Sequence, residues 1–150
     1  MIDRGRLIRQ MNADFGMTMN RIRVLLADDH PAMLAQIESL LEDEFDVIGK
    51  VADGQALVDM GAELQPEVII ADITMPIVDG IEAARRLRAA GNPGKIVFLS
   101  VHEDADFVNA ALDAGGNAYV VKSRLATDLI GAIRSAIAGS QFISPTISRG

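Results

Sequence analysis

Short apolar runs rich in β-branched residues alternate along this chain with longer stretches in which apolar positions recur every three or four residues. A short run of this kind predicts a buried strand, and a longer periodic stretch predicts an amphipathic helix. The predicted strands are IRVLLA (22–27), DVIGKVA (46–52), EVIIADI (67–73), KIVFLSV (95–101) and NAYVVK (117–122). The first, third and fourth runs are apolar on both sides of the strand, which is typical of parallel strands covered by helices on both faces.

Each periodic stretch carries a signal for where its helix begins or ends. Pro31 suits the first position of the first helix, Asp53 is a candidate cap for the second, and glycines follow the last apolar positions of the others. The predicted helices begin near residues 31, 55, 80, 104 and 125. Alternating strands and helices predict an α/β fold, a (βα)5 doubly wound, five-stranded parallel sheet in a three-layer sandwich.

Composition limits what this domain does. The chain has 150 residues, 49% of them apolar, which is enough for one folded domain with a substantial core. It has no cysteine, which excludes disulfides, thiolate metal sites and thiol nucleophiles. A formal charge of −7 argues against nucleic-acid binding by this segment itself. The densest basic cluster, Arg85, Arg86 and Arg88, is interpreted as a solvated helix face.

Apolar positions show no clear periodicity in the first 20 residues. This predicts a flexible N-terminal tail at 1–20, followed by a folded domain at 21–138. They contain charges but no apolar segment of the kind found in secretory signals. No apolar run reaches the roughly 18 residues of a membrane-spanning helix. We therefore expect a cytoplasmic protein with no membrane partner.

Polar residues follow several predicted strands at their carboxyl ends, where open parallel α/β sheets bind ligands. Asp28 and Asp29 follow the first strand, Asp72 lies at the end of the third, Ser100 at the end of the fourth, and Lys122 at the end of the fifth. Three clustered carboxylates need compensating positive charge, and the lysine provides only one. Oxygen ligands favour Mg²⁺ over zinc or copper. The pattern predicts a Mg²⁺ site with room for a phosphoryl group.

Each of these residues also has an ordinary structural explanation when taken alone. Either acid of the Asp28–Asp29 pair fits a helix N-cap, Ser100 fits a turn, and Lys122 fits the cap of a strand end. His30 is interpreted as a loop or helix-start residue, and His102 as a candidate modulator of the nearby site. The combination, rather than any single residue, predicts function.

Four motifs in order resemble the receiver domain of two-component response regulators: DD after the first strand, DITMP..DG at 72–80, LS at 99–100 and YVVK at 119–122. The resemblance spans residues 21–138 and implies a flavodoxin-like receiver fold. Finer motifs, including DDHP, AGGNAYVVKS and a trailing Ser-Pro, are similar to the NarL/FixJ (LuxR-type) class.

The resemblance implies a phosphoryl-transfer site. Asp72 is the implied phosphoacceptor for a sensor histidine kinase, and Lys122 the implied partner of a phosphoryl oxygen. Ser100 and Tyr119 form the implied conformational switch, in which the tyrosine turns inward after phosphorylation. The domain then catalyses only its own phosphorylation and dephosphorylation and is not an enzyme for outside substrates.

The resemblance also implies the ligands of the expected Mg²⁺ cofactor. These are Asp29 directly, Asp28 through water, the Asp72 carboxylate and the backbone carbonyl of Thr74.

Regulators of the NarL/FixJ class carry a linker and a helix-turn-helix DNA-binding domain after the receiver. We expect residues 139–150 to begin such a linker, toward a DNA-binding domain that is not in this sequence. Transcription control through that domain and homodimerisation on phosphorylation are the implied outputs. The alternative is a stand-alone receiver that acts as a protein-binding module or a phosphate sink.

Two other classes share the expected architecture. A flavodoxin-like flavin binder needs backbone donors for its phosphate in the first strand-to-helix turn, where Asp28 and Asp29 repel an anion. A haloacid-dehalogenase-like phosphatase needs a second acid two residues after the first, where this chain has Thr74. The acid pair and the threonine argue against both classes.

Overall fold

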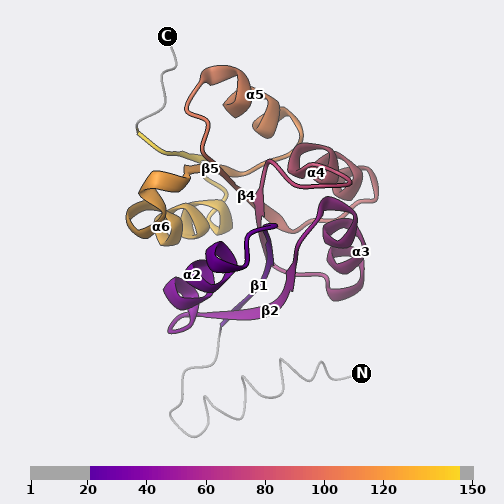
Figure 1. Cartoon of the computed structure of the whole chain (residues 1–150), viewed down its shortest axis with the longest axis horizontal. Helices are drawn as coiled ribbons and strands as arrows, with labels where there is room; N and C mark the ends of the chain where they lie inside the picture. Colours follow the sequence, from indigo (N-terminus) through magenta and orange to yellow (C-terminus); the bar gives the residue numbers. More distant parts are fainter. Residues whose placement is uncertain (1–20, 146–150) are drawn as a thin grey trace, which may run out of the picture.

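A parallel sheet of six strands forms the centre of the molecule in this computed structural model, which describes residues 21–145 (Figure 1). The strands are β1 (Ile22–Ala27), β2 (Phe45–Val51), β3 (Val68–Asp72), β4 (Lys95–Ser100), β5 (Ala118–Val121) and β6 (Phe142–Ile143). Their order in the sheet is β2-β1-β3-β4-β5-β6, and every neighbouring pair is parallel. The chain therefore winds outward from β1 in both directions, and the doubly wound prediction is confirmed.

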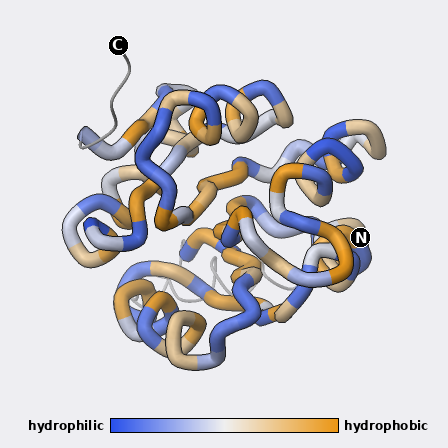
Figure 2. Tube along the Cα trace, turned by 45° about the horizontal axis from the view of Figure 1, so that its top comes forward, coloured by the Kyte–Doolittle hydropathy of each residue, from blue (hydrophilic) through white to orange (hydrophobic). Residues whose placement is uncertain are grey.

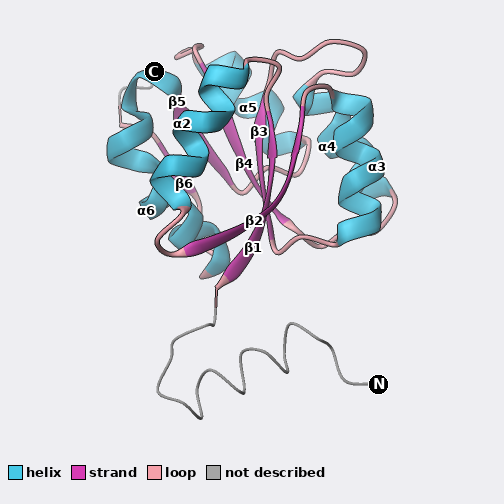
Figure 3. Cartoon of the chain, turned by 60° about the horizontal axis from the view of Figure 1, so that its bottom comes forward, coloured by secondary structure: helices cyan, strands magenta, loops and turns pink. Residues whose placement is uncertain are grey.

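Helices cover both faces of this sheet, as Figure 3 shows from the side. The helices are α2 (Pro31–Leu41), α3 (Gly54–Leu64), α4 (Gly80–Ala89), α5 (Ala105–Asp113) and α6 (Leu125–Ile137), with a 3-10 turn, η1 (Lys122–Arg124), before α6. Helices α3, α4 and α5 pack on one face, and α2 and α6 on the other. The three-layer α/β sandwich is thus confirmed.

Consecutive residues of the central strands enter opposite layers of the core. Ile69 and Phe98 pack in the cluster beneath α3, α4 and α5, whereas Ile70 and Leu99 pack in the cluster beneath α2 and α6. Burial on both faces explains why these strands are apolar throughout. Figure 2 shows hydrophobic colouring on the central strands and hydrophilic segments in the outer helices and loops.

Aspartates hold the starts of three helices that follow strands. The carboxylates of Asp53, Asp79 and Asp104 each accept a hydrogen bond from the backbone N–H three residues later, at 2.7, 2.8 and 3.1 Å. Such caps stabilise a helix start by about 1 kcal/mol each. They fix the loops at the carboxyl edge of the sheet, and the predicted role of Asp53 is confirmed.

The sheet is one strand wider than the five-stranded prediction. Phe142 and Ile143 pair in parallel with Ala118 and Tyr119 of β5, and both lie inside the predicted linker at 139–150. Two residues are too few to show the alternation that reveals a strand, so only tertiary pairing identifies this one.

The ends of the chain lie outside the described residues, and with them the predicted N-terminal tail (1–20) and the last residues of the predicted linker (146–150). Within residues 21–145 no helix combines the length and the apolar character needed to cross a membrane.

Candidate functional site

The ammonium of Lys122 joins two buried carboxylates at the carboxyl edge of the sheet. Its Nζ lies 3.1 Å from Oδ2 of Asp28 and 3.0 Å from Oδ2 of Asp72. The side chains of Asp28, Asp72 and Lys122 are 0%, 6% and 13% exposed. The interpretation of Lys122 as only a strand-end cap is therefore wrong.

Topology brings these three residues together from distant parts of the sequence. Asp72 is the last residue of β3, and Asp28 follows directly after β1, the neighbouring strand. Ala27 pairs with Ala71, so the two acids occupy the same level of the sheet. Lys122 follows β5, two strands from β3, and its long side chain reaches both acids.

Burial and neighbouring charge shift the pKa values of Asp72 and Lys122 in opposite directions. Burial raises the pKa of the Asp72 carboxyl, with a further rise from Asp28, and the hydrogen bond and charge of Lys122 offset only part of this effect. Burial by itself lowers the pKa of Lys122, but hydrogen bonds to the two carboxylates outweigh it, and the net pKa is raised. The lysine is thus held as a cation between two acids.

Four side chains form a cluster with metal-binding geometry. One ligand atom from each of Asp28, Asp29, His30 and Asp72 lies within 4.8 Å of the others. Carboxylate oxygens are the ligands that Mg²⁺ prefers, so the acids fit the predicted ion. Nδ1 of His30 lies 3.1 Å from an oxygen of each of the two neighbouring acids, while its side chain is 68% exposed.

The acid pair does not cap the following helix. His30 occupies the N-cap position of α2 and makes no side-chain capping bond, as expected of a helix-start residue. Oδ1 of Asp28 instead accepts the backbone N–H of His30 at 2.9 Å. The N-cap explanation of Asp28 and Asp29 is therefore wrong, and both acids remain directed to the site.

The loop after β3 packs closely around Asp72. The backbone N–H of Thr74 donates to Oδ1 of Asp72 at 3.2 Å, whereas the predicted role of the Thr74 carbonyl stays a prediction. A Cβ at Gly80, where α4 begins, would lie 2.2 Å from the carbonyl oxygen of Asp72. Only glycine allows this close approach, which explains the glycine of the DITMP..DG motif.

The predicted switch residues meet at the backbone of His102. The hydroxyl of Ser100 accepts the N–H of His102 at 3.0 Å, and the hydroxyl of Tyr119 donates to the carbonyl of His102 at 2.8 Å. The ring of His102 stacks on Phe107, with centroids 3.8 Å apart. The sequence predicts that His102 lies near the site, but it does not reveal this linking position, because only the fold aligns residue 102 with residue 119.

Tyr119 is already inward in this structure. Its side chain is fully buried, and burial raises the pKa of its hydroxyl. Within residues 21–145 no hydrogen bond joins Ser100 to Asp72; the serine hydroxyl is engaged by His102 as in an ordinary turn. The tyrosine thus needs no inward movement from this conformation.

Comparison with known proteins identifies the family. Residues 24–134 match the family model of the response regulator receiver domain. The chain belongs to this family. Its curated relatives include the transcriptional regulatory protein DegU of Brevibacillus brevis, 33% identical over 131 residues, and LiaR of Bacillus subtilis, 37% identical over 129 residues. These alignments cover 86% and 85% of this chain but only 56% and 61% of the relatives. The chain thus spans less than two thirds of their length.

Solved structures support the same assignment. A LuxR-family two-component response regulator from Aurantimonas sp. superposes with a TM-score of 0.81 at 31% identity, covering 85% of this chain and 93% of that one. The isolated receiver domain of RcsB from Salmonella enterica, with the phosphomimetic BeF3−, gives 0.78 at 30% identity, covering 87% and 98%. The receiver is therefore of the NarL/LuxR type.

Proposed function

We propose that this receiver domain accepts a phosphoryl group on Asp72 from a sensor histidine kinase, in a Mg²⁺-dependent reaction. The observation that carries the proposal is the position of Lys122, whose ammonium lies within 3.1 Å of both Asp28 and Asp72 at the mouth of the sheet. Membership of the receiver family supports it. A cytoplasmic location, where the phosphodonor domain of such a kinase lies, belongs to the same proposal.

The carboxylate of Asp72 is the nucleophile. One of its oxygens forms the new bond to phosphorus while the bond between phosphorus and the donor's imidazole nitrogen breaks, and that nitrogen keeps the electron pair. The product is an acyl phosphate. Oδ2 of Asp72 already faces Lys122 and Oδ1 already accepts the N–H of Thr74, so the attacking group is oriented before the donor arrives.

Lys122 stabilises the charge that collects on the phosphoryl oxygens during transfer. Asp29 and Asp72 would hold Mg²⁺ directly, Asp28 through water, and the Thr74 carbonyl would complete the protein ligands. The bound ion supplies further positive charge beside the phosphoryl group. The net acidic cluster is what makes such a cation favourable here.

Output follows from a change in the Ser100 contact. A phosphoryl group on Asp72 brings strong acceptor oxygens to the site. The Ser100 hydroxyl moves toward them and donates a hydrogen bond to one, which acts on the His102 N–H that the same hydroxyl accepts. Because His102 also accepts the Tyr119 hydroxyl, the loop after β4 responds as a unit. Dimerisation and transcription control through a helix-turn-helix domain are the proposed readout, and RcsB dimers bound to DNA provide the precedent. A stand-alone receiver that binds a protein partner or drains phosphate is the second candidate.

Intact-mass measurement after incubation with acetyl phosphate and Mg²⁺ tests the proposal. We expect one added phosphoryl group in the wild type and in the control Asp113→Asn, whose aspartate lies exposed at the end of α5. We expect none in Asp72→Asn or without Mg²⁺. An unchanged wild-type mass at saturating phosphodonor contradicts the assignment.

A further inference from the structure

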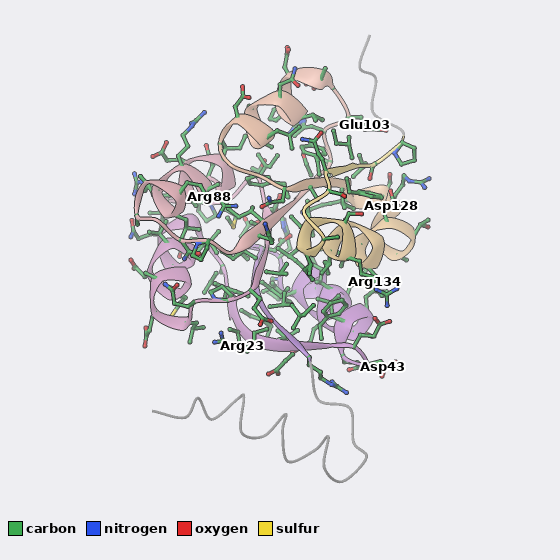
Figure 4. The ribbon with its side chains drawn as sticks, turned by 180° about the vertical axis from the view of Figure 1, so that it is seen from behind. Arg23, Asp43, Arg88, Glu103, Asp128 and Arg134 are labelled. Carbon is green, nitrogen blue, oxygen red and sulfur yellow. The ribbon has the colours of Figure 1, made fainter. Side chains whose placement is uncertain are left out.

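A second buried polar cluster lies on the other side of β5, and phosphoryl transfer does not use it. Asp128 of α6 is 5% exposed and accepts two hydrogen bonds from the Arg124 guanidinium, at 2.8 and 3.1 Å. It also accepts the hydroxyl of Ser144 at 2.8 Å, and Ser144 is 1% exposed. Figure 4 shows Asp128 on α6 beside the C-terminal strand. A buried carboxylate is costly unless it is paired, so these bonds hold Ser144 firmly.

Ser144 fastens the C-terminal strand to β5 at two further points. Its backbone N–H donates to the carbonyl of Tyr119 at 3.0 Å, and its hydroxyl accepts the N–H of Val121 at 3.0 Å. The two residues before it pack in different core layers: Ile143 in the layer beneath α3, α4 and α5, and Phe142 in the layer beneath α2 and α6. The segment Phe142–Ser144 is therefore an integral part of the sheet.

The contacts of this segment lie next to Lys122 and Tyr119, two residues of the proposed phosphorylation site and switch. Val121 directly precedes Lys122, and Arg124 follows it two residues later. The cluster therefore holds the backbone N–H of Val121 before the bridging lysine and the side chain of Arg124 after it. Tyr119, whose hydroxyl donates to the carbonyl of His102 after β4, is held through its backbone by Ser144. Movement of Lys122 or Tyr119 therefore acts on atoms that also dock the C-terminal strand.

We propose that Phe142–Ser144 is a latch whose docking on β5 is thermodynamically linked to phosphorylation of Asp72, with Asp128 and Ser144 as positioning residues. The inference rests on the proposed function of Asp72. It assigns a signalling role to a segment outside the matched family region, which ends at residue 134.

The direction of the linkage follows from the conformation of Tyr119. In this structure the latch is docked and the side chain of Tyr119 is inward. The latch pairs with the backbone of Tyr119 itself. A phosphoryl group that favours the inward tyrosine therefore also favours the docked latch. Because coupling is reciprocal, a weakened latch lowers the affinity of the site for a phosphoryl group by the same factor.

The direction of β6 also places the end of the latch at one edge of the sheet. Since β6 runs parallel to β5, its carboxyl end lies at the same edge of the sheet as Asp72. Ser144 therefore lies at the edge of the sheet that carries Asp72, and release of the latch separates the segment Phe142–Ser144 from β5.

Amide hydrogen exchange on the full chain tests the linkage, with beryllofluoride and Mg²⁺ as the phosphoryl analogue and fluorine NMR to measure analogue binding. The informative amide is that of residue 144. In the wild type we expect the analogue to slow its exchange by about fivefold or more, the lower end of ordinary coupling. The control Ser140→Ala changes an exposed serine of the same segment and should behave as the wild type.

Ser144→Ala removes the hydroxyl that reaches Asp128, and we expect it to bind the analogue about fivefold more weakly and to lose the analogue-dependent slowing. Asp128→Asn, which removes the charge but keeps the size, should do the same. If both variants fail to fold, the effect of the analogue on exchange at residue 144 in the wild type and in Ser140→Ala is sufficient to test the linkage. Unchanged exchange at residue 144 while fluorine NMR shows bound analogue overturns the latch and leaves the proposed function intact. Absence of both analogue binding and acetyl phosphate labelling overturns the proposed function, and the latch with it.

Discussion

Lys122 and Asp28 are joined directly, with Nζ 3.1 Å from Oδ2 of a carboxylate that is fully buried. Asp28 is not the proposed phosphoacceptor, yet it shares the ammonium with the residue that is, Asp72. The lysine is thus anchored independently of Asp72, and its charge is in position before a phosphoryl group arrives. Electrostatic groups that need no reorganisation during the reaction are the most effective ones.

Replacing Lys122 with Met should destabilise the fold strongly, because two buried carboxylates lose their shared cation. Removing one partner of a buried ion pair costs about 3 kcal/mol or more. Urea unfolding measures this loss, and added Mg²⁺ should recover part of it, since the acid cluster then binds a different cation. The control Lys50→Met breaks an exposed pair with Glu38 and should cost at most about 1 kcal/mol. Equal losses for the two variants contradict the prediction.

Asp72→Asn should stabilise the fold at neutral pH. Burial raises the pKa of this carboxyl in the folded state above the ordinary value of 3.8, so its ionisation opposes folding. Removing that charge should raise the free energy of unfolding by about 0.5–2 kcal/mol, as is common when a functional site is relieved of strain.

The pH dependence of this stability difference tests whether the charge of Asp72 causes it. A raised folded-state pKa means that the folded protein binds the proton more tightly, so the wild type loses stability as pH rises through that pKa. The advantage of Asp72→Asn should therefore vanish below pH 3.8, where the carboxyl is protonated in both states. Unfolding curves from pH 3 to pH 8 measure the difference; an advantage that persists in acid contradicts the electrostatic explanation.

Ile77 adopts a strained backbone conformation beside the site. Its φ is +71°, and the N–H of Val78 donates to the carbonyl of Pro76 at 2.8 Å, which closes a γ-turn around it. A β-branched residue is disfavoured there, by about 1–2 kcal/mol, and Ile77 is 79% exposed, so little burial compensates.

Asn tolerates positive φ, so Ile77→Asn should raise the free energy of unfolding by about 1 kcal/mol. Val101→Asn is the matched control, because Val101 is 69% exposed but is not among the positive-φ residues of the described chain. Thermal unfolding of the two variants separates relief of backbone strain from the simple loss of an exposed apolar side chain. An equal rise in the free energy of unfolding of both variants contradicts the explanation by backbone strain at Ile77.

Much of the site was predictable because a parallel sheet brings the carboxyl ends of its strands to one edge. The order of the strands predicts that Asp28, Asp72 and Lys122 lie together, and the structure confirms their proximity. Contacts that depend on a few tertiary hydrogen bonds were not predictable. The pairing of Phe142–Ser144 with β5 leaves no periodic pattern, and the meeting of residues 102 and 119 depends on how two loops align.

The arginine cluster of α4 shows the same limit. Arg85 and Arg86 are exposed, as the prediction of a solvated helix face requires, but the prediction is wrong for Arg88. The Arg88 guanidinium is partly buried and donates to the carbonyls of Asn92, Gly94 and Gly115, and burial lowers its pKa. The three arginines are alike in sequence, and only the positions of the loops before β4 and β5 distinguish the third.

Arg88→Met should therefore destabilise the fold by about 2–3 kcal/mol, because carbonyl groups in two loops lose their donor while the aliphatic volume is kept. Arg85→Met, one turn earlier on the same helix, removes only an exposed pair with Glu82 and should change stability by about 0.5 kcal/mol or less. Urea unfolding compares the two. Arg88 lies away from the carboxyl edge of the sheet. Within residues 21–145 it forms no hydrogen bond with Asp72 or Lys122. Folded Arg88→Met should therefore still gain a phosphoryl group from acetyl phosphate. A folded variant that is not labelled would mean that the loops before β4 and β5 also shape the site.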